Sequence, residues 1–182
     1  MNKQVPPLAA ALASAERIHD GDVLAAAITR MAGEIDTELA GRPAVFLTVM
    51  QGALPFAGQL ATLLSSPLTF DYVHATRYRG ETSGGALHWV KRPNVSLAGA
   101  TVLLVDDILD EGHTLAEIRD YCSAQGAARV LIAVLCEKRH GRGVGLRAEF
   151  VGVEVPDRYV FGYGMDYHEQ GRNLPAIYAV DA

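Results

Sequence analysis

The stretch VLLVDDILDEGHTL, residues 102–115, decides the fold. It begins with a run of apolar residues, continues into the adjacent acids Asp106 and Asp107, and then passes Gly112. A nearly continuous run of branched apolar residues is typical of a strand buried on both faces of a parallel sheet. We therefore predict a strand that ends in the two acids, a turn around Gly112, and a helix from Leu115 onward.

The residues on either side alternate between short apolar runs and amphipathic stretches, which indicates an α/β fold with a mainly parallel sheet. The segment between residues 77 and 100 is rich in glycine and charge, which predicts a mobile loop with a short strand or hairpin near residues 86–90. Strands are predicted over residues 44–49, 68–76, 101–107 and 128–138. Helices are predicted over residues 8–39, after residue 50, and over residues 114–126, where Gly126 ends the helix. The first helical region has a break at Gly21, with Asp20 or Asp22 as the cap of its second part.

Composition limits the class of protein. The 182 residues suffice for one domain, 49% of them are hydrophobic, and the net charge is -5. The acidic balance argues against a nucleic-acid partner, which usually meets a basic face. Two cysteines without metal-ligand spacing favour a reduced, cytoplasmic setting. The N-terminal residues read as a short tail and a helix rather than a signal peptide, and no apolar run predicts a membrane span.

The turn in the opening stretch suits a phosphate group. Backbone N–H groups at a helix start bind anions, Gly112 allows close approach, and His113 and Thr114 add donors. Carboxylates suit hydroxyl donors or a metal instead, so Asp106 and Asp107 favour a ribose diol or a cation. A ribose 5-phosphate has both parts close together.

Two other interpretations compete for these acids. Acids near a helix start often only cap it, and Asp110 could do so. The letters DDILD, residues 106–110, also match the D-D-x-x-D motif of prenyl-diphosphate enzymes. Those enzymes are all-helical with two such motifs, whereas this chain has one copy, and it follows a predicted strand.

The stretch resembles the phosphoribosyl-diphosphate (PRPP) motif of the type I phosphoribosyltransferases. The resemblance continues through VLCEKRH (134–140), FVGVEVPDRYVFGYGMDY (150–167) and GRNLPAIY (171–178), which look like the hypoxanthine-guanine phosphoribosyltransferases. It implies a single domain over residues 1–182, with a central sheet flanked by helices and a small hood from the N-terminal and C-terminal segments. It also implies Mg²⁺ and a homodimer or homotetramer.

The resemblance implies roles in binding PRPP. Asp106 and Asp107 would hold the ribose hydroxyls and help bind Mg²⁺, and Asp110 would take the proton of purine N7. Arg172 would reach pyrophosphate, and Asp166 would help hold Mg²⁺. The 5-phosphate would be cradled by Asp110, Glu111, Gly112, His113 and Thr114; we expect the side chain of Glu111 to point away, because its charge would repel a phosphate.

Lys138 would donate to the purine 6-oxygen, because an ammonium donor fits a carbonyl oxygen and not an adenine amino group. Tyr159 would stack on the base, and Val160 would bind the edge of the base through its backbone. Taken alone, Lys138 reads as a solvated lysine and Tyr159 as a packing residue. The remaining histidines form no spaced cluster, so we assign them no metal.

Two loops depart from the family pattern. Gln51 and Gly52 match the pyrophosphate loop, where a basic residue usually stands at the position of Gln51 and a cis peptide would join it to Met50. Arg77 and Tyr78 match the mobile loop that covers the site, with Arg77 where the family often has serine.

The reaction that the resemblance implies is transfer of ribose 5-phosphate from PRPP to hypoxanthine or guanine, giving IMP or GMP and pyrophosphate. A xanthine-preferring enzyme would change only the base. A PRPP-binding regulatory protein on the same fold would bind RNA or DNA, which the acidic net charge disfavours.

Overall fold

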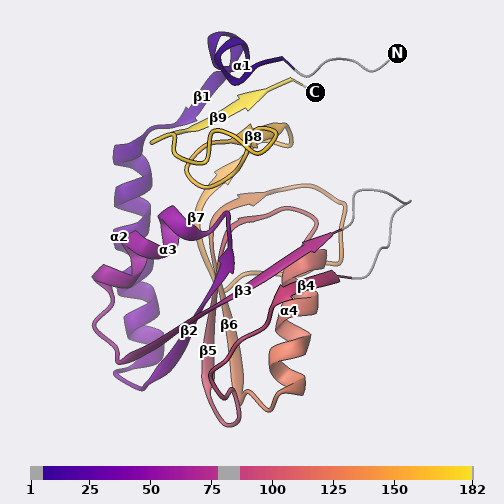
Figure 1. Ribbon diagram of the computed structural model, residues 1–182. Coiled ribbons are helices and arrows are strands. Elements are labelled where there is room, and N and C mark those ends of the chain that lie inside the picture. The colour runs from indigo at the N-terminus through magenta and orange to yellow at the C-terminus, as the bar shows by residue number, and fades with distance from the viewer. Residues whose placement is uncertain (1–5, 78–86, 182) are drawn as a thin grey trace.

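The computed structural model describes residues 6–77 and 87–181, and these residues form a large sheet with a smaller sheet above it (Figure 1). The large sheet has the order β4-β3-β2-β5-β6-β7. All neighbouring pairs are parallel except β4 with β3. Its strands are β2 (Ala44–Met50), β3 (Leu68–Arg77), β4 (Leu87–Lys91), β5 (Thr101–Leu109), β6 (Arg129–Lys138) and β7 (Phe150–Val155).

β5 lies near the middle of the sheet, as its sequence predicts. Its side chains alternate between the two faces: Leu103 and Val105 belong to one apolar core, and Val102 and Leu104 to the other. All four are fully buried. A strand that is covered on both faces must be apolar at successive positions, which accounts for its unbroken apolar run.

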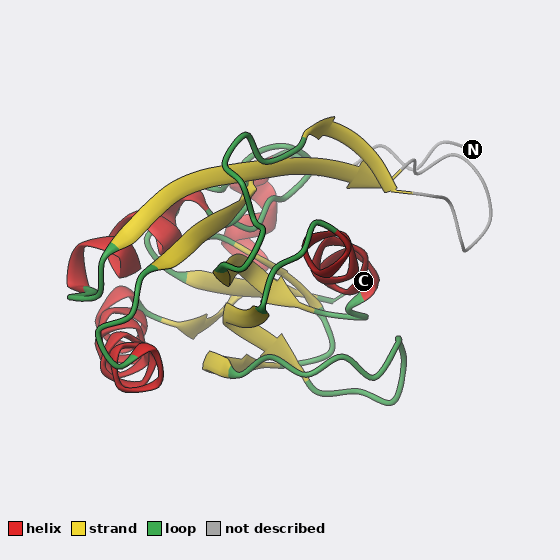
Figure 2. Ribbon diagram, turned by 90° about the horizontal axis from the view of Figure 1, so that it is seen from below, coloured by secondary structure: helices red, strands yellow, loops and turns green. Residues whose placement is uncertain are grey.

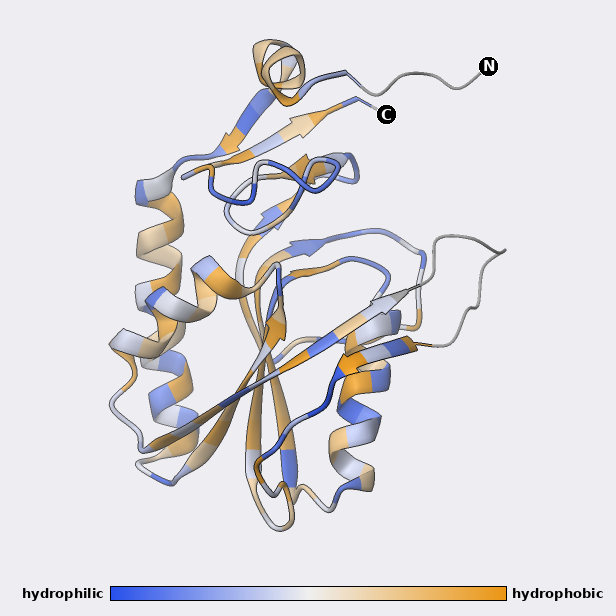
Figure 3. Ribbon diagram, viewed as in Figure 1, coloured by the Kyte–Doolittle hydropathy of each residue, from blue (hydrophilic) through white to orange (hydrophobic). Residues whose placement is uncertain are grey.

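Helices cover both faces of the large sheet (Figures 1 and 2). α2 (Gly21–Leu39) and α3 (Leu54–Leu63) pack on one face, and α4 (His113–Ala124) packs on the other. The hydropathy colouring shows apolar strands between helices of mixed character (Figure 3). Such amphipathic helices bury their apolar stripe on the sheet and leave the polar side exposed.

Two residues that the sequence analysis named as helix caps, Asp20 and Gly126, lie at the start of α2 and just after the end of α4. The side chain of Asp20 accepts a hydrogen bond from the N–H of Val23, which makes it the N-cap of α2. α4 ends in a Schellman motif, in which Ala127 N–H donates to Cys122 and Gly126 N–H to Ser123. Gly126 has a φ of 86°, a conformation that favours glycine.

The smaller sheet is the hood, and it joins distant parts of the chain. Its order is β1-β9-β8, and both pairs are antiparallel. The buried side chains of Ala11, Phe161 and Tyr167 form a core of its own. Its elements are α1 (Leu8–Ser14), β1 (Glu16–His19), β8 (Tyr159–Phe161) and β9 (Ile177–Val180).

The prediction of helix through residues 8–39 was wrong at β1. Residues 16–19 pair with β9, with Glu16 opposite Ala179 and Arg17 opposite Tyr178. A strand partner so far along the chain overrides the local helical pattern, because it satisfies the backbone of both segments. The predicted strand near residues 86–90 is confirmed as β4.

In the ranges that the structure describes, no helix is both long and apolar enough to cross a membrane. Cys122 and Cys136 are buried and unpaired. Burial raises the pKa of the Cys122 thiol to about 11, so this thiol stays protonated near neutral pH.

Candidate active site

The turn after β5 encloses a cavity. β5 ends at Leu109, Gly112 has a φ of 78°, and α4 begins at His113. A Cβ atom at Gly112 would lie 3.0 Å from the Cβ of Leu146, so the turn leaves little room for a side chain there. The start of a helix is a favourable place for an anion. The cavity has a volume of about 550 Å³ and is lined by Asp106, Asp107, Ile108, Asp110, Glu111, Gly112, His113, Thr114 and Leu115.

Two adjacent carboxylates near the carboxyl end of β5, Asp106 and Asp107, line this cavity. Asp106 is 8% exposed, and its side chain accepts a hydrogen bond of 2.9 Å from the N–H of Asp107. Burial, and then the charge of Asp107, raises the pKa of Asp106 well above its usual value. Burial also raises the pKa of Asp107, although a hydrogen bond from Asp106 and the charge of Arg172 oppose this. Hydroxyl donors or a cation would stabilise both charged forms.

The loop between β2 and α3 lies against Asp107. A Cβ atom at Gly52 would lie 1.9 Å from Oδ2 of Asp107, so only glycine fits without displacing that carboxylate. The peptide bond between Met50 and Gln51 is cis, which confirms the expectation drawn from the resemblance. A second cavity of about 560 Å³ opens beside this loop and is lined by Met50, Gln51, Leu54, Pro55, Tyr72, His74, Arg172 and Asn173.

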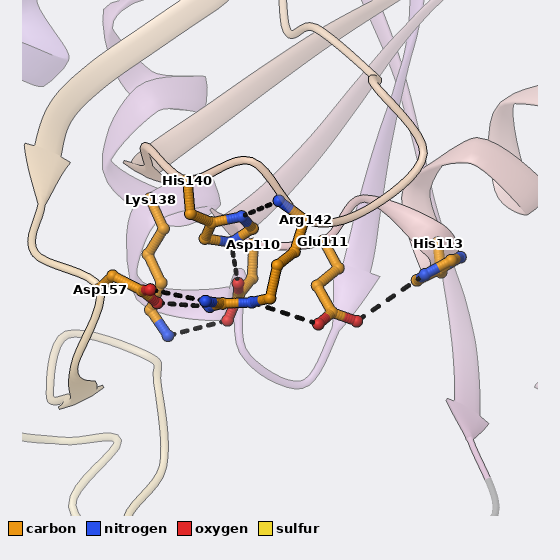
Figure 4. Close-up of polar contacts among 7 residues, drawn as sticks. All are labelled: Asp110, Glu111, His113, Lys138, His140, Arg142 and Asp157. Atoms are coloured by element: carbon orange, nitrogen blue, oxygen red, sulfur yellow. Dashed lines mark hydrogen bonds and ion pairs between the residues drawn. The ribbon is translucent and has the colours of Figure 1, made fainter. Parts of the chain in front are cut away.

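Asp110 holds two nitrogen donors at the edge of the first cavity (Figure 4). Lys138 Nζ lies 2.8 Å from Asp110 Oδ2, and His140 Nε2 lies 2.6 Å from Asp110 Oδ1. Partial burial would raise the pKa of Asp110, but the hydrogen bonds from Lys138 and His140, together with the charge of Lys138, outweigh it and lower the pKa. Asp110 is therefore a charged acceptor near neutral pH.

Glu111 lies between two basic side chains (Figure 4). Its carboxylate is 3.8 Å from Nε of Arg142 and 3.7 Å from Nε2 of His113. Arg142 in turn forms a two-pronged ion pair with Asp157, at 2.7 and 2.5 Å. The charge of Glu111 is thus compensated within the cluster, which reduces its repulsion of an anion in the cavity.

The segment after β8 joins the site from the hood. Tyr159 Oη donates to the carbonyl oxygen of Asp166 at 3.2 Å, and the Tyr159 ring lies parallel to that of His168, with centroids 5.9 Å apart. Arg172 binds Asp166 Oδ1 at 2.9 Å and the carbonyl of Gly164 at 2.7 Å. Arg172 therefore has one fixed position beside the second cavity.

The family model of the phosphoribosyl transferase domain matches residues 14–169. The chain belongs to this family. It is 35% identical over 156 residues to the hypoxanthine-guanine phosphoribosyltransferase of Aquifex aeolicus, across 85% of this chain and 88% of the relative. It is 36% identical over 157 residues to the bifunctional protein TilS/HprT of Listeria monocytogenes, across 86% of this chain. The chain spans about a quarter of that longer protein, 24% of its length.

Solved structures of the same family have the same architecture. A hypoxanthine-guanine phosphoribosyltransferase from Bacillus anthracis superposes with a TM-score of 0.87 and 30% identity, covering 92% of this chain and 99% of that one. A hypoxanthine phosphoribosyltransferase from Staphylococcus aureus gives 0.86 and 27%, with 91% of each chain covered. The prediction of a type I phosphoribosyltransferase fold with a hood is therefore confirmed.

The predicted Mg²⁺ carboxylates of this phosphoribosyl transferase domain come from the large sheet and from the hood segment between β8 and β9. Asp106 and Asp107 lie near the carboxyl end of β5, which continues to Leu109, two residues beyond the predicted end of the strand. Asp166 belongs to the hood segment and already binds Arg172. Among the residues that the structure describes, no three histidine, cysteine or acidic side chains form a cluster that could hold a metal by themselves. The carboxylates still fit magnesium, which prefers few protein oxygens together with water and substrate phosphate oxygens.

Two residues were predicted for the covering loop, Arg77 and Tyr78. Arg77 is the last residue of β3, and Tyr78 lies outside the described residues. The predicted base-binding residues Tyr159 and Val160 form the start of β8, with Val160 buried.

Three members of the polar cluster were not predicted from the sequence, namely His140, Arg142 and Asp157. His140 stands two residues after Lys138, at the carboxyl end of β6, and ligands of parallel sheets bind beyond such ends. Its position just after a predicted strand was therefore the signal in the sequence that could have identified His140 as a site residue. Its partner Asp110 is 30 residues away, so the contact itself has no trace in the local pattern.

Proposed function

We infer that this chain is an enzyme of purine salvage, a hypoxanthine-guanine phosphoribosyltransferase. It transfers ribose 5-phosphate from PRPP to hypoxanthine or guanine and gives IMP or GMP and pyrophosphate. Relatives that bear this name and match most of the chain support the inference. The observation that carries it is the cavity around residues 106–115, with Asp110 and Lys138 in contact at its edge.

The reaction needs charge stabilised on both sides of ribose C1. As pyrophosphate leaves with the electrons of the C1–O bond, C1 becomes oxocarbenium-like, and N9 of the base then bonds to C1 with its lone pair. We propose that Asp106 and Asp107 hold the ribose hydroxyls, while the turn that includes Gly112 and Thr114 binds the 5-phosphate. Asp106 is buried and Asp107 is half-buried, so water screens their charges less than it would at an exposed site.

Asp110 is the acceptor of the proton on purine N7 in this proposal. Its pKa lies below the usual value, because the donors Lys138 and His140 outweigh burial, so the carboxylate is charged near neutral pH. When the N7 proton moves to Asp110, the electrons of the N–H bond remain in the ring, and the product base is neutral.

Lys138 provides base selectivity in this scheme. Its side chain is 12% exposed and forms an ion pair with Asp110, so it is largely shielded from water. It would donate to the 6-oxygen of hypoxanthine or guanine and would meet the 6-amino group of adenine donor to donor. Tyr159 supplies an aromatic face for the base, and base–aromatic stacking is worth about 1–3 kcal/mol.

We propose Mg²⁺ as the cofactor, held by Asp106, Asp107 and Asp166 together with phosphate oxygens of PRPP. The ion would neutralise the leaving pyrophosphate. Arg172 has a fork of donors for the same group. Gln51 has no charge to offer there, so we expect the pyrophosphate loop to bind through backbone N–H groups that Gly52 leaves accessible.

We further propose a homo-oligomer, either a dimer or a tetramer. Exposed apolar side chains on one face of β3 and on α3 support it: Phe70, Tyr72 and Leu54 are 58%, 41% and 56% exposed. The unpaired thiols of Cys122 and Cys136 support the proposed cytoplasmic location.

A steady-state assay with PRPP and Mg²⁺ tests the function, with hypoxanthine, guanine, xanthine and adenine compared in parallel. Turnover of hypoxanthine or guanine with adenine inert is the expected result. A strong preference for xanthine would leave the mechanism in place and change the substrate. PRPP binding without turnover of any base would overturn the enzymatic assignment in favour of a regulatory protein.

A further inference from the structure

His140 is the second donor to Asp110, and it comes from the loop that follows β6. Its Nε2 lies 2.6 Å from Asp110 Oδ1, whereas Lys138 binds the other oxygen, Oδ2. The His140 side chain is 6% exposed, compared with 41% for Asp110. A buried ring beside a half-exposed carboxylate restricts the rotation of that carboxylate.

The second ring nitrogen identifies the tautomer of His140. The backbone N–H of Arg142 points to His140 Nδ1 at 3.2 Å (Figure 4). A backbone N–H only donates, so Nδ1 must accept and carries no proton. In the neutral ring the proton is then on Nε2, which donates to Asp110.

We propose that His140 is the positioning residue of the proton acceptor Asp110: it holds Oδ1 through its Nε2–H, so that Oδ2 is the oxygen that receives the proton of purine N7. This inference rests on the proposed function. Lys138 binds Oδ2 in this structure and moves to the 6-oxygen when a base binds. Nε2 of His140 stays on Oδ1 of Asp110 and keeps its hold on the carboxylate.

The proposed step is balanced within the pair. The N7–H bond breaks, its electrons stay on the ring, and the proton bonds to Oδ2, which makes Asp110 neutral. His140 keeps its own proton throughout, because a neutral Nε2–H donor can bind both the charged and the neutral carboxyl group. No further reactant is needed.

Other charged groups face the pair, and they set the background for any pH dependence. Lys138 comes from β6, Arg142 from the same loop as His140, Glu111 from the turn after β5, and Asp157 from the connection between β7 and β8. Arg142 is satisfied by Asp157 and Glu111. Lys138 and His140 are therefore the direct partners of Asp110 among the described residues.

The variants His140→Leu and His140→Gln test the proposal in the full-length protein. Leucine fills similar space without a donor, and glutamine restores an N–H near the position of Nε2. For His140→Leu we expect kcat to fall on the order of tenfold, with the affinity for PRPP retained. The acidic limb of the pH profile should move up by about one pH unit, because the charged form of Asp110 loses a donor.

His140→Gln should restore most of the turnover and return the acidic limb toward its original pH. Arg139→Ala is the matched control, since Arg139 is the neighbouring residue, its side chain is 72% exposed, and it contacts Glu154 rather than Asp110. An unchanged pH profile in His140→Leu, or equal losses in the leucine and glutamine variants, would overturn the positioning role.

A second measurement needs no catalysis. Long-range ¹⁵N–¹H spectra of the wild-type protein without added substrate should show a proton on Nε2 of His140 and none on Nδ1 at neutral pH. A ring protonated on Nδ1 would contradict the proposal whether or not the enzyme turns over. The spectra could show the Nε2 tautomer while no purine reacts. That result would refute the proposed function. It would also refute the positioning role, because the hydrogen bond between His140 and Asp110 would then serve no reaction.

Discussion

At the scale of single residues, Asp110 combines two properties that a proton acceptor needs. It is charged near neutral pH, because donors from Lys138 and His140 outweigh its burial. It is also held in one orientation, because each carboxylate oxygen has a donor within 2.8 Å. These contacts favour the charged form of Asp110. In the proposed scheme Lys138 leaves Asp110 when the base arrives, whereas His140 stays bound to it.

Replacing Asp110 by asparagine should separate binding from chemistry. Asparagine keeps the shape of the side chain but cannot take the N7 proton, so we expect kcat to fall by about 10²–10⁴-fold. PRPP binding should change little, because in the proposed complex the 5-phosphate is bound by the turn that includes Gly112 and Thr114 and not by the Asp110 carboxylate. Titration calorimetry with PRPP and Mg²⁺ together with steady-state rates checks this, with the exposed Asp120→Asn on α4 as the control. Near-normal turnover in Asp110→Asn would exclude the base role.

Gly52→Ala should damage the PRPP site through a steric clash. The new Cβ would lie 1.9 Å from Oδ2 and 2.6 Å from Cγ of Asp107, so the carboxylate must leave its position. We expect the affinity for PRPP to fall by about tenfold or more, because a buried charged contact is lost. Gly58→Ala on α3 is the matched control: nothing lies within 4 Å of its Cβ, and it should stabilise the helix by about 0.5–1 kcal/mol. Equal PRPP affinity in both variants would contradict the clash.

At the scale of elements, one buried carboxylate joins the edge of the large sheet. Asp71 on β3 binds Lys91 Nζ on β4 at 2.7 Å and the N–H groups of Asn94 and Val95 at 2.5 and 3.0 Å. Burial opposes its ionisation, but these donors prevail and lower the pKa of Asp71 to about 2. The carboxylate thus holds the antiparallel strand β4 and the turn after it in place.

The contribution of Asp71 to stability should depend on pH with a definite sign. Its folded pKa of about 2 lies below the value of about 3.9 in unfolded chains, so the stabilisation is complete above pH 4 and is lost as the pH falls toward 2. Asp71→Asn should lower the free energy of unfolding by about 2 kcal/mol at pH 7. Urea unfolding at pH 7, 4 and 3 checks this. A difference between the two proteins that stayed constant down to pH 3 would refute the prediction.

At the scale of the whole molecule, the candidate site lies where the large sheet meets the hood. Asp106 and Asp107 lie near the carboxyl end of β5, whereas Asp166 and Arg172 belong to the segment between β8 and β9. The two parts pack closely: a Cβ atom on Gly164 would lie 2.0 Å from the carbonyl oxygen of Gly52. A ligand that contacts both parts stabilises them together.

PRPP with Mg²⁺ should therefore raise the melting temperature of the protein. At a hundredfold excess over Kd, binding adds about 2.7 kcal/mol, which is about 5–10 °C for a domain of this size. EDTA should remove most of this shift, because the phosphates would then face the carboxylates without a cation. Thermal unfolding with PRPP, Mg²⁺, both or neither checks it. A full shift with PRPP in EDTA would argue against the proposed metal.

In the same thermal unfolding experiment, Asp106→Asn should remove the stabilisation by PRPP and Mg²⁺ without lowering the stability of the free protein. Burial and the charge of Asp107 raise the pKa of Asp106, so the charged carboxylate costs stability at neutral pH. The variant should be at least as stable as wild type without ligand and should lose the shift with PRPP and Mg²⁺. A less stable variant in the absence of ligand would contradict this account of Asp106.

The sequence by itself determined the unit from β5 to α4. The apolar run, the two acids, Gly112 and the helix start lie within residues 102–115, and neighbours along the chain meet in the fold without help from distant segments. The alternation of strands and helices in the large sheet was also predictable from the sequence, because each strand and each helix has its own local pattern of apolar residues.

Only the tertiary structure decided three features. It placed residues 16–19 in a strand beside β9, it packed Gly52 against Asp107, and it brought His140 to Asp110. Each joins residues that are 30 or more positions apart. Local periodicity reports on neighbours within a turn or a strand, whereas such contacts depend on how complete elements pack, so they become visible only when the chain is folded.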